Sequence, residues 1–337
     1  MSEVAGKNKK ISVIIPNFNG RNFLATCLAS LKRQAFDDFE LVLVDNGSDD
    51  DSVFLVKKEF PKAIIYVFKD NVGFSRAVNR GIELSAGDYI FLLNNDTELA
   101  DDCLENIVYF LDEHPEASFL ALKMLYFSNR KLINGAGDML SIYGLACQRG
   151  KGENDEGQYE NIIEVFGACA GAAVYRRELF SDIGSFDEDY FAYLEDIDFS
   201  FRAQLKGYKC FYLPSSVVYH VDGGTSRKIP NFSQFLITRN GLYLVYKNFP
   251  VFLFLILSPF LLVGQLRNVV SALKRGNPGI ITRAYRDFFV NLSKLKKKRK
   301  IIQNERRISV FKILFILSKR YPFSFRRSLA NIFLKNI

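Results

Sequence analysis

Cysteine and histidine are both scarce in this chain of 337 residues. The cysteines are odd in number, lie far apart within apolar stretches and form no CxxC pair, which excludes a paired-cysteine zinc site. We expect them to be buried thiols in a reducing compartment. The five positions are Cys27, Cys103, Cys147, Cys169 and Cys210.

A long apolar run is missing from the start of the chain. Residues 1–10 are polar and basic, and the apolar run at residues 11–15 is too short for the central region of a secretory signal peptide. We therefore expect a flexible N-terminal tail over residues 1–10 and a first part of the chain that stays in the cytosol.

Apolar residues are abundant throughout, and positive charge is abundant toward the end. Hydrophobic residues make up 48% of the chain, enough for a sizeable core, and the length suits one large domain with an appendage. Residues 267–337 carry 19 lysines and arginines against two acids, whereas the preceding part carries 26 against 35. The two parts must face different surroundings.

The first half alternates strand-length apolar runs with helical patterns. Strands are expected over residues 11–15, 39–44, 63–68 and 89–93. Helices are expected over residues 23–32, 52–60 and 73–85, where apolar residues recur at helical spacing. This alternation predicts an α/β fold with a Rossmann-like, mostly parallel sheet flanked by helices.

A polar cluster follows each of these expected strands, at residues 16–20, 45–49, 69–73 and 94–96. Any one cluster fits ordinary turn chemistry, in which Asn, Asp, Gly and Ser are common. In a parallel sheet, however, ligands bind beyond the carboxyl ends of the strands. Four successive clusters at such ends therefore favour a binding site.

One of the two histidines, His220, follows a group of acids and, closer to it, an expected short strand over residues 209–213 with a turn near Pro214. Asp196, in the run Glu-Asp-Ile-Asp at residues 195–198, lies 24 residues before His220, and Asp96 lies further upstream. A divalent cation and an activated hydroxyl both need groups of this kind, which points to transfer chemistry on a phosphorylated donor. A lone histidine is also common as a packed or surface residue.

A longer series of motifs runs through residues 11–240. It comprises SVIIPNFN at residues 12–19, VDNGSD at 44–49, NVGF at 71–74 with Asn79 and Gly81, LLNNDT at 92–97, GSFDE at 184–188, YLEDID at 193–198, Arg202, Gly207 and His220. Each motif alone is weak, but the ordered set resembles glycosyltransferase family 2, especially its rhamnosyltransferase-like members.

The resemblance implies a GT-A fold, a nucleotide-diphosphate sugar donor and inversion at the anomeric carbon. By this likeness the donor is held by Pro16, Asn17, Asn19, Asp45, Asn71, Gly73, Asn94, Asn95 and Gly171. The position of Asp45 supports this role. A carboxylate after the second strand is placed to accept hydrogen bonds from ribose hydroxyls or a base N–H.

The resemblance also implies Mg²⁺ or Mn²⁺, held by Asp96 and His220 together with the donor diphosphate. The family's turn after the fourth strand presents two acids around one residue, and here the first of them is Asn94. Mg²⁺ commonly uses one or two carboxylates plus phosphate oxygens, so metal use remains the expectation, with weaker binding. Asp96 also fits a plain turn residue or a helix N-cap.

Asp196 is the expected general base. In an inverting transfer one carboxylate must take the proton from the acceptor hydroxyl. Asp196 would lie at the start of a helix, where the dipole favours its ionised form. Two alternatives stay open: Glu195 is the base, or Asp196 only caps the N-terminus of the helix. Asp198 and Arg202, spaced i,i+4, are expected to form a structural salt bridge.

Three further features leave their roles open. The small residues at 167–173 fit either a sugar-binding wall or a tightly packed strand. The loop at residues 223–226 is expected to close over the diphosphate and exclude water. The glycines that often follow the third motif in the family are replaced by Ser75, Arg76 and Ala77, so the donor's base and sugar stay open.

The end of the chain predicts attachment to a membrane. Residues 248–266 carry no charge and would span roughly 28 Å as a helix, although Pro259 interrupts them. Spanning, re-entrant and interfacial arrangements all fit. An anionic lipid surface would attract the cations at residues 294–300. It would also suit the apolar segment 311–317, which is followed by Lys319, Arg320, Arg326 and Arg327. A single crossing would carry the basic tail to the far side, so we favour re-entrant or interfacial attachment at the cytoplasmic face.

Taken together, the sequence predicts a catalytic domain over residues 11–240 and a basic, apolar, helical membrane-associating region over residues 241–337. The expected activity is inverting glycosyl transfer to a saccharide acceptor, carried on a polyprenyl diphosphate, in surface polysaccharide synthesis. No nucleic-acid partner is expected, because the basic residues are interleaved with apolar ones and no RNA or DNA module is visible. A metal-dependent nucleotidyltransferase and a non-catalytic nucleotide-sugar-binding scaffold are the alternatives.

Overall fold

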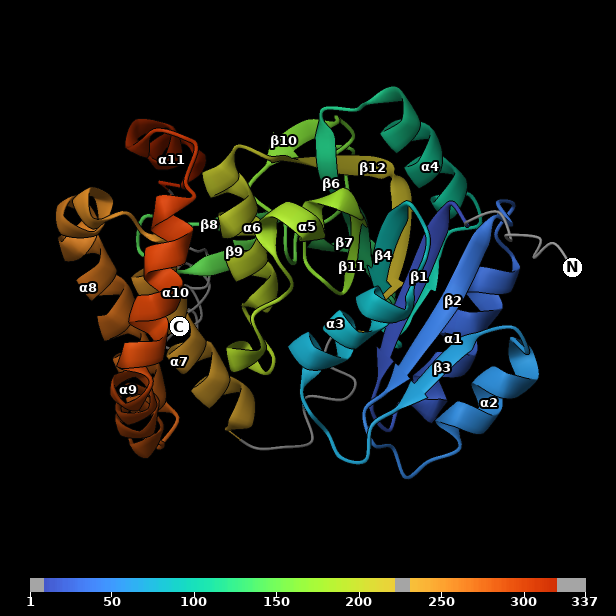
Figure 1. Ribbon diagram of the computed structural model, residues 1–337, viewed down its shortest axis with the longest axis horizontal. Helices are drawn as coiled ribbons and strands as arrows, with labels where there is room; N and C mark the ends of the chain where they lie inside the picture. Colours follow the sequence, from blue (N-terminus) through green and yellow to red (C-terminus); the bar gives the residue numbers. More distant parts are fainter. Residues whose placement is uncertain (1–8, 222–230, 320–337) are drawn as a thin grey trace, which may run out of the picture.

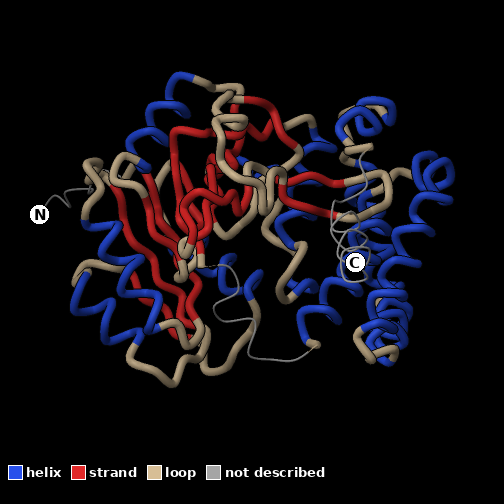
Figure 2. Tube along the Cα trace, turned by 180° about the vertical axis from the view of Figure 1, so that it is seen from behind, coloured by secondary structure: helices blue, strands red, loops and turns tan. Residues whose placement is uncertain are grey.

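The structure, a computed structural model, describes residues 9–221 and 231–319 (Figure 1). One mixed sheet runs through the centre, with the strand order β10-β12-β6-β11-β4-β1-β2-β3. Helices cover both of its faces, and a separate helical layer, α7 to α11, stands at the end of the molecule opposite the N-terminus (Figure 2). The expected α/β architecture with a C-terminal helical extension is confirmed. Of the tail predicted over residues 1–10, only Lys9 and Lys10 lie within the described residues.

The N-terminal half follows the predicted alternation of strands and helices. Its elements are β1 (Ile11–Asn17), α1 (Arg21–Lys32), β2 (Phe39–Asp45), α2 (Ser52–Glu59), β3 (Ile64–Val67), α3 (Phe74–Leu84) and β4 (Tyr89–Leu93). β1 pairs in parallel with β2 and β4, and β2 pairs in parallel with β3. The register places Asn17 opposite Asp45, so the polar turns after β1 and β2 begin side by side.

The second half of the sheet is largely antiparallel, so the sheet as a whole is mixed. β11 (Ala172–Arg176) lies antiparallel between β4 and β6 (Ala117–Tyr126), and β12 (Lys209–His220) is parallel to β6. Short strands extend this half: β5 (Thr97–Leu99), β7 (Asn129–Gly135) and β10 (Ile163–Val165). A separate hairpin pairs β8 (Asp138–Leu140) with β9 (Ala146–Gln148).

β12 is longer than the sequence suggests. A strand at residues 209–213 followed by a turn near Pro214 is wrong, because the strand continues to His220. The pairing with β6 shifts register between Leu213 and Val217, and this irregularity accommodates Pro214, which has no N–H for the ladder. The extension brings His220 to the end of the strand, opposite Thr97 of β5.

Each face of the sheet has its own core because alternate strand residues point to opposite sides. Ile11, Val13 and Ile15 pack with α1, α2 and α4 (Cys103–Glu113). Ile14 packs on the other face with α3, α5 (Glu178–Ile183) and α6 (Glu195–Lys206). These two layers fix the strand ends that carry the polar turns.

The C-terminal helices pack on α6 and on the β8–β9 hairpin. They are α7 (Phe232–Asn248), α8 (Val251–Lys274), α9 (Gly279–Val290), α10 (Leu292–Asn304) and α11 (Val310–Ile316). Leu253, Leu257 and Leu261 of α8 share a buried cluster with Phe201 and Leu205 of α6. The division at residue 240 stays a prediction, and α7 runs across it.

Candidate active site

The turns after β1 and β2 are joined by a buried polar network. The Nδ2 of Asn17 donates to Asp45 Oδ1 at 2.9 Å, and the Oδ1 of Asn17 accepts from Asn95 Nδ2 at 2.7 Å. Asp45 also accepts from the backbone N–H and the hydroxyl of Ser48, at 2.9 and 2.6 Å. Asn17, Asp45 and Asn95 are nearly or fully buried, and a satisfied buried network of this kind is rigid.

Gly20 makes this convergence possible. A Cβ added at residue 20 would lie 2.0 Å from Asn95 Nδ2 and 2.5 Å from Asn17 Oδ1. Only glycine therefore lets the first and fourth turns touch. The surface above the buried network is formed by Pro16, which lies opposite Val44 in the β1–β2 register, and by Asn19, whose backbone N–H donates to Ser48 Oγ at 2.9 Å.

The third turn joins the second through Asn46. Its Nδ2 donates to Asn71 Oδ1 and to the carbonyl of Gly73, both at 3.1 Å, and its Oδ1 accepts from the Val72 N–H at 3.0 Å. Asn71 is exposed, and Gly73, with a φ of 91°, starts α3. The structure thus brings Asn71 and Gly73 to the same sheet edge as Asn17 and Asp45.

Asp96 and His220 meet at this edge. His220 Nε2 lies 3.3 Å from Asp96 Oδ1, although the two residues are far apart in sequence, and both side chains are at most a tenth exposed. His220 Nδ1 lies 3.1 Å from Asn134 Oδ1. With the amide oxygen as acceptor, Nδ1 carries a proton, and Nε2 is the ring nitrogen that faces the carboxylate.

This donor set fits a divalent cation that takes part of its shell from the substrate. A cation between Asp96 Oδ1 and His220 Nε2 would be bound by both atoms. The contact of His220 Nδ1 with Asn134 Oδ1 fixes the orientation of the imidazole, as hydrogen-bond partners of metal ligands do. Residues 9–221 and 231–319 contain no group of three or more His, Cys, Asp or Glu suited to a metal. Asp96 and His220 would therefore need diphosphate oxygens and water to complete a Mg²⁺ or Mn²⁺ shell.

Asn94 and Gly171 connect the fourth turn to Asp196. The Asn94 N–H donates to the carbonyl of Gly171 at 2.9 Å, and a Cβ at residue 171 would lie 3.2 Å from Asn94 Nδ2. The preceding residue, Ala170, donates its N–H to Asp196 Oδ2 at 3.2 Å. Of the small-residue stretch at residues 167–173, only the last two residues belong to β11 (Ala172–Arg176). Asp196 thus lies next to the same turn as Asp96.

The carboxylate of Asp196 is held by backbone N–H groups at the start of α6. Besides Ala170, Ile197 donates its N–H to Asp196 Oδ1 at 2.8 Å. Burial nevertheless raises the pKa of Asp196 above its usual value, and these N–H bonds only partly oppose it. Asp196 lies in the first turn of α6, as expected, and burial acts against the ionised form there. Burial, followed by the charge of Asp196, also raises the pKa of the neighbouring Glu195.

Asp198 makes ion pairs and a hydrogen bond that hold the fold together. It is fully buried, accepts from Arg202 Nε at 3.0 Å in the predicted i,i+4 salt bridge, and accepts from the Tyr190 hydroxyl at 3.0 Å. Lys247 of α7 lies 3.0 Å from it. The prediction of a structural salt bridge between Asp198 and Arg202 is confirmed.

Sequence reasoning did not single out several residues of this site. Asn46 and Ser48 stood inside a motif already identified, so a closer reading of that motif could have found them. Asn134 gave no signal, because nothing in residues 129–135 marks it as the partner of His220. Asp138, 3% exposed, also gave none; burial and the charge of Asp196 raise its pKa well above its usual value. The expected closing loop at residues 223–226 lies outside the described residues.

Comparisons with known proteins relate the chain to one family. A family model described as Glycosyl transferase family 2 matches residues 12–184. The PGL/p-HBAD biosynthesis glycosyltransferase of Mycobacterium bovis (strain BCG / Pasteur 1173P2) is 30% identical over 215 residues, which cover 62% of this chain and 73% of that protein. The minor teichoic acid biosynthesis protein GgaB of Bacillus subtilis (strain 168) is 32% identical over 129 residues, 36% of this chain and 14% of that protein.

Two solved structures share the fold. GalNAc-T7 with UDP, GalNAc and Mn²⁺ is similar with a TM-score of 0.58 and 16% identity, over 73% of this chain and 49% of that one. S. aureus TarS 1–349 in complex with UDP is similar with a TM-score of 0.51 and 21% identity, over 75% of this chain and 70% of that one. The expected GT-A-like fold is confirmed by these likenesses.

Proposed function

Because the chain belongs to glycosyl transferase family 2, we propose that it is an inverting enzyme that moves a sugar from a nucleotide-diphosphate sugar to a saccharide acceptor in surface polysaccharide synthesis. One observation carries the proposal: Asp96 and His220 meet at 3.3 Å beside the turn after β4, and Asp196 is linked to the same turn through Ala170 and the Gly171–Asn94 hydrogen bond. Glycosyl transfer needs a diphosphate-binding group and a base close together. This edge offers both.

The proposed reaction is a single displacement. The acceptor hydroxyl oxygen bonds to the anomeric carbon while the bond from that carbon to the diphosphate oxygen breaks, and the nucleoside diphosphate leaves with the electron pair. Asp196 takes the hydroxyl proton, a role typically worth about 10²–10⁴-fold in rate. Its raised pKa makes it a stronger base than an exposed aspartate, and its two N–H bonds fix the carboxylate for the transfer.

The donor would lie over the rim of the joined turns. Asp45 is fully buried, so in this proposal it orders Asn17 and Ser48, while the accessible Pro16, Asn19 and Asn71 meet the nucleotide. Asp96 and His220 would hold Mg²⁺ or Mn²⁺, which when bound neutralises charge that builds on the leaving diphosphate. Asn94 and Gly171, between this pair and Asp196, would lie beside the sugar.

The acceptor in this proposal is carried on a polyprenyl diphosphate in the cytoplasmic face of the cell membrane. In the part of the chain that the structure describes, α8 is the one helix long and apolar enough to cross a membrane. Its outward residues are exposed at helical spacing, and they include Phe252, Leu255, Leu262, Leu266 and Leu273. Lysines and arginines on and after it suit anionic lipid.

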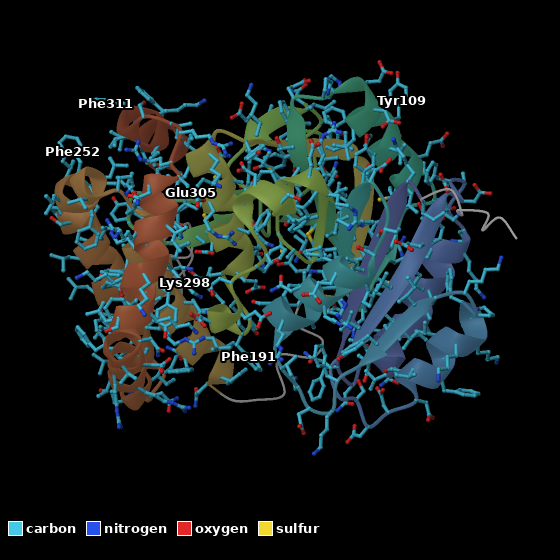
Figure 3. All side chains as sticks on the ribbon, viewed as in Figure 1. Tyr109, Phe191, Phe252, Lys298, Glu305 and Phe311 are labelled. Atoms are coloured by element: carbon cyan, nitrogen blue, oxygen red, sulfur yellow. The ribbon has the colours of Figure 1, made fainter. Side chains whose placement is uncertain are left out.

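The packing of α8 favours attachment within the membrane interface. The opposite side of the helix is buried along its length, at Leu253, Leu257, Leu261 and Gly264, against the catalytic domain. The chain then returns, because α9 and α10 pack on α7. A helix held in this way lies along a surface and would expose only its outer side to lipid. Phe311 of α11 lies near Phe252 at the same end of the layer (Figure 3).

A panel of nucleotide sugars, scored by the nucleotide released with and without Mn²⁺, tests the function. We expect release of an intact nucleoside diphosphate that depends on one donor and is stimulated by the metal. Release of pyrophosphate would instead identify a nucleotidyltransferase. Binding of a nucleotide sugar without turnover, across a broad set of donors and acceptors, would identify a non-catalytic scaffold.

Replacement of Asp196 by Asn tests the base. The variant keeps the size of the side chain and its acceptor oxygen but cannot take a proton, so turnover should fall by about 100-fold or more while donor affinity stays near that of the wild type. Glu195→Gln is the matched control, because Glu195 is the neighbouring acid. Near-normal activity of Asp196→Asn would remove Asp196 from this role. A loss of turnover in Glu195→Gln without a loss in Asp196→Asn would assign the role to Glu195.

A further inference from the structure

The loop that leads into α6 is strained. Phe191, Tyr193 and Leu194 all have positive φ, at 64°, 68° and 67°, and they make up three of the five such non-glycine residues in the described chain. Bulky side chains rarely adopt this conformation, because the left-handed region is sterically unfavourable for them. Leu194 is the N-cap of α6, and its carbonyl accepts the Asp198 N–H at 2.9 Å. The strain thus lies immediately before Glu195 and Asp196.

A single buried amide on α7 holds this loop. Asn240 is fully buried, and its Nδ2 donates to the carbonyls of Tyr190, Ala192 and Tyr193, at 3.0, 2.9 and 2.6 Å. An amide nitrogen has two hydrogens, so three carbonyls share them. All three acceptors lie in the strained segment or next to it. Asn240 therefore supplies donors to three carbonyls of this irregular backbone, of which the Tyr190 carbonyl also accepts the Ala192 N–H at 2.8 Å.

Arg239 orients that amide. Its Nε donates to Asn240 Oδ1 at 3.0 Å, which turns the Nδ2 toward the loop, and its Nη2 donates to the carbonyls of Asp189 and Tyr190, both at 2.9 Å. Asp287 of α9 anchors the guanidinium on its other side, at 3.2 Å. The orientation of Asn240 is therefore set by a charged partner.

The opposite side of the loop lies against the donor turn. The Phe191 carbonyl accepts the Ser75 N–H at 3.2 Å, and a Cβ at Gly73 would lie 2.7 Å from the Phe191 ring. The loop is thus held between the start of α3 and the middle of α7. Movement of this segment would displace Asp196 relative to the donor site.

From this geometry, and resting on the proposed function, we infer that Asn240 is a positioning residue for glycosyl transfer: it keeps the strained segment 190–194 in the conformation that presents Asp196 to the acceptor hydroxyl. It touches no reacting atom itself. Loss of its amide would let the segment relax toward ordinary φ values. A displacement of about 1 Å at a reacting group can cost on the order of 100-fold in rate.

The test combines Asn240→Ala with Asp196→Asn in a double-mutant cycle. With the donor that the panel identifies, and release of nucleoside diphosphate as the readout, Asn240→Ala should lower kcat by about 10- to 100-fold with little change in the donor KM. In the Asp196→Asn background the same change should cost less than about 3-fold, because its effect acts through Asp196. A purely structural role would give equal losses in both backgrounds and would overturn the inference.

The matched control is Thr238→Val on the same helix. Thr238 is buried, but its hydroxyl donates within α7, to the Gln234 carbonyl at 2.9 Å, so this variant should keep near-normal kcat.

If Asn240→Ala does not fold, Asn240→Ser takes its place in the cycle, because serine keeps one hydrogen-bond donor. Normal kcat in a folded Asn240 variant contradicts the inference, whereas an inactive wild type with every donor contradicts the proposed function instead.

Discussion

Asp196 gives the site its expected pH dependence. Burial raises the pKa of this carboxyl, and the N–H bonds from Ala170 and Ile197 lower it by less. A general base works only when ionised, so activity should be lost as the pH falls through the raised pKa. The acidic limb of the profile of kcat/KM against pH should therefore lie above the usual range of an aspartate. A limb at or below that range would contradict the assignment of Asp196.

The candidate site was predictable from sequence where its residues follow strands. Asn17, Asp45, Asn71 and Asp96 stand within three residues of the ends of apolar runs, and a parallel sheet brings such ends together. Asn134 and Asn240 could not be predicted in this way, because each acts through the tertiary packing of segments distant in sequence. The raised pKa of Asp196 was also beyond the sequence, since burial depends on the closed fold.

At the scale of elements, strands were easier to predict than their direction. The first four strands alternate with amphipathic helices, and this pattern requires parallel pairing. β11 and β6 are joined by loops and short strands that carry no such periodicity, so their antiparallel pairing appears only in the fold. β12 was cut short in the prediction because Pro214 usually ends a strand, whereas here a register shift accommodates it.

The outer side of α8 makes a prediction at the same scale. Leu255 and Leu262 are each 64% exposed and lie seven residues apart, on one side of the helix. Burial of a leucine in lipid is worth about 1.5–3 kcal/mol, so the double change to Glu should lower binding to anionic vesicles by more than about 10-fold. Flotation of vesicles with bound protein measures this.

The control for that experiment is Tyr109→Glu. Tyr109 is 71% exposed on α4, at the end of the molecule away from α8 (Figure 3). Its replacement adds a negative charge without touching the proposed membrane surface, so vesicle binding should stay at the wild-type level. Equal binding of the Leu255 and Leu262 variant would rule out this surface.

At the scale of the whole molecule, ion pairs join the C-terminal helices to the catalytic domain. Lys247 of α7 pairs with Asp187 and Asp198. Lys298 of α10 lies 2.5 Å from Asp187, and Lys294 pairs with Asp189. The acids of the segment 187–189 thus hold Lys294 and Lys298, and the contact of the basic run at residues 294–300 with lipid stays a prediction.

Replacement of Lys247 by Met tests this network. Lys247 is 1% exposed, and its loss removes one cation from two buried carboxylates, while Asp187 keeps Lys298 and Asp198 keeps Arg202. Removal of one partner of a buried ion pair typically costs about 3–5 kcal/mol. Because each carboxylate keeps one cation, urea unfolding should show a loss at the lower end of this range, with the slope unchanged. The exposed Lys297 provides the control, since Lys297→Met should change stability by no more than about 0.5 kcal/mol.

The path of α7 decides how a soluble form of this enzyme can be prepared. The helix carries Asn240 and Lys247, and then leads through Pro250 directly into α8. Deletion of the chain beyond residue 240 would remove Lys247. Deletion from the start of α8 would expose Leu205 and Phe249 to solvent. Polar substitutions on the outer side of α8 keep all of these contacts. They are therefore the better route to material for crystallisation and kinetics.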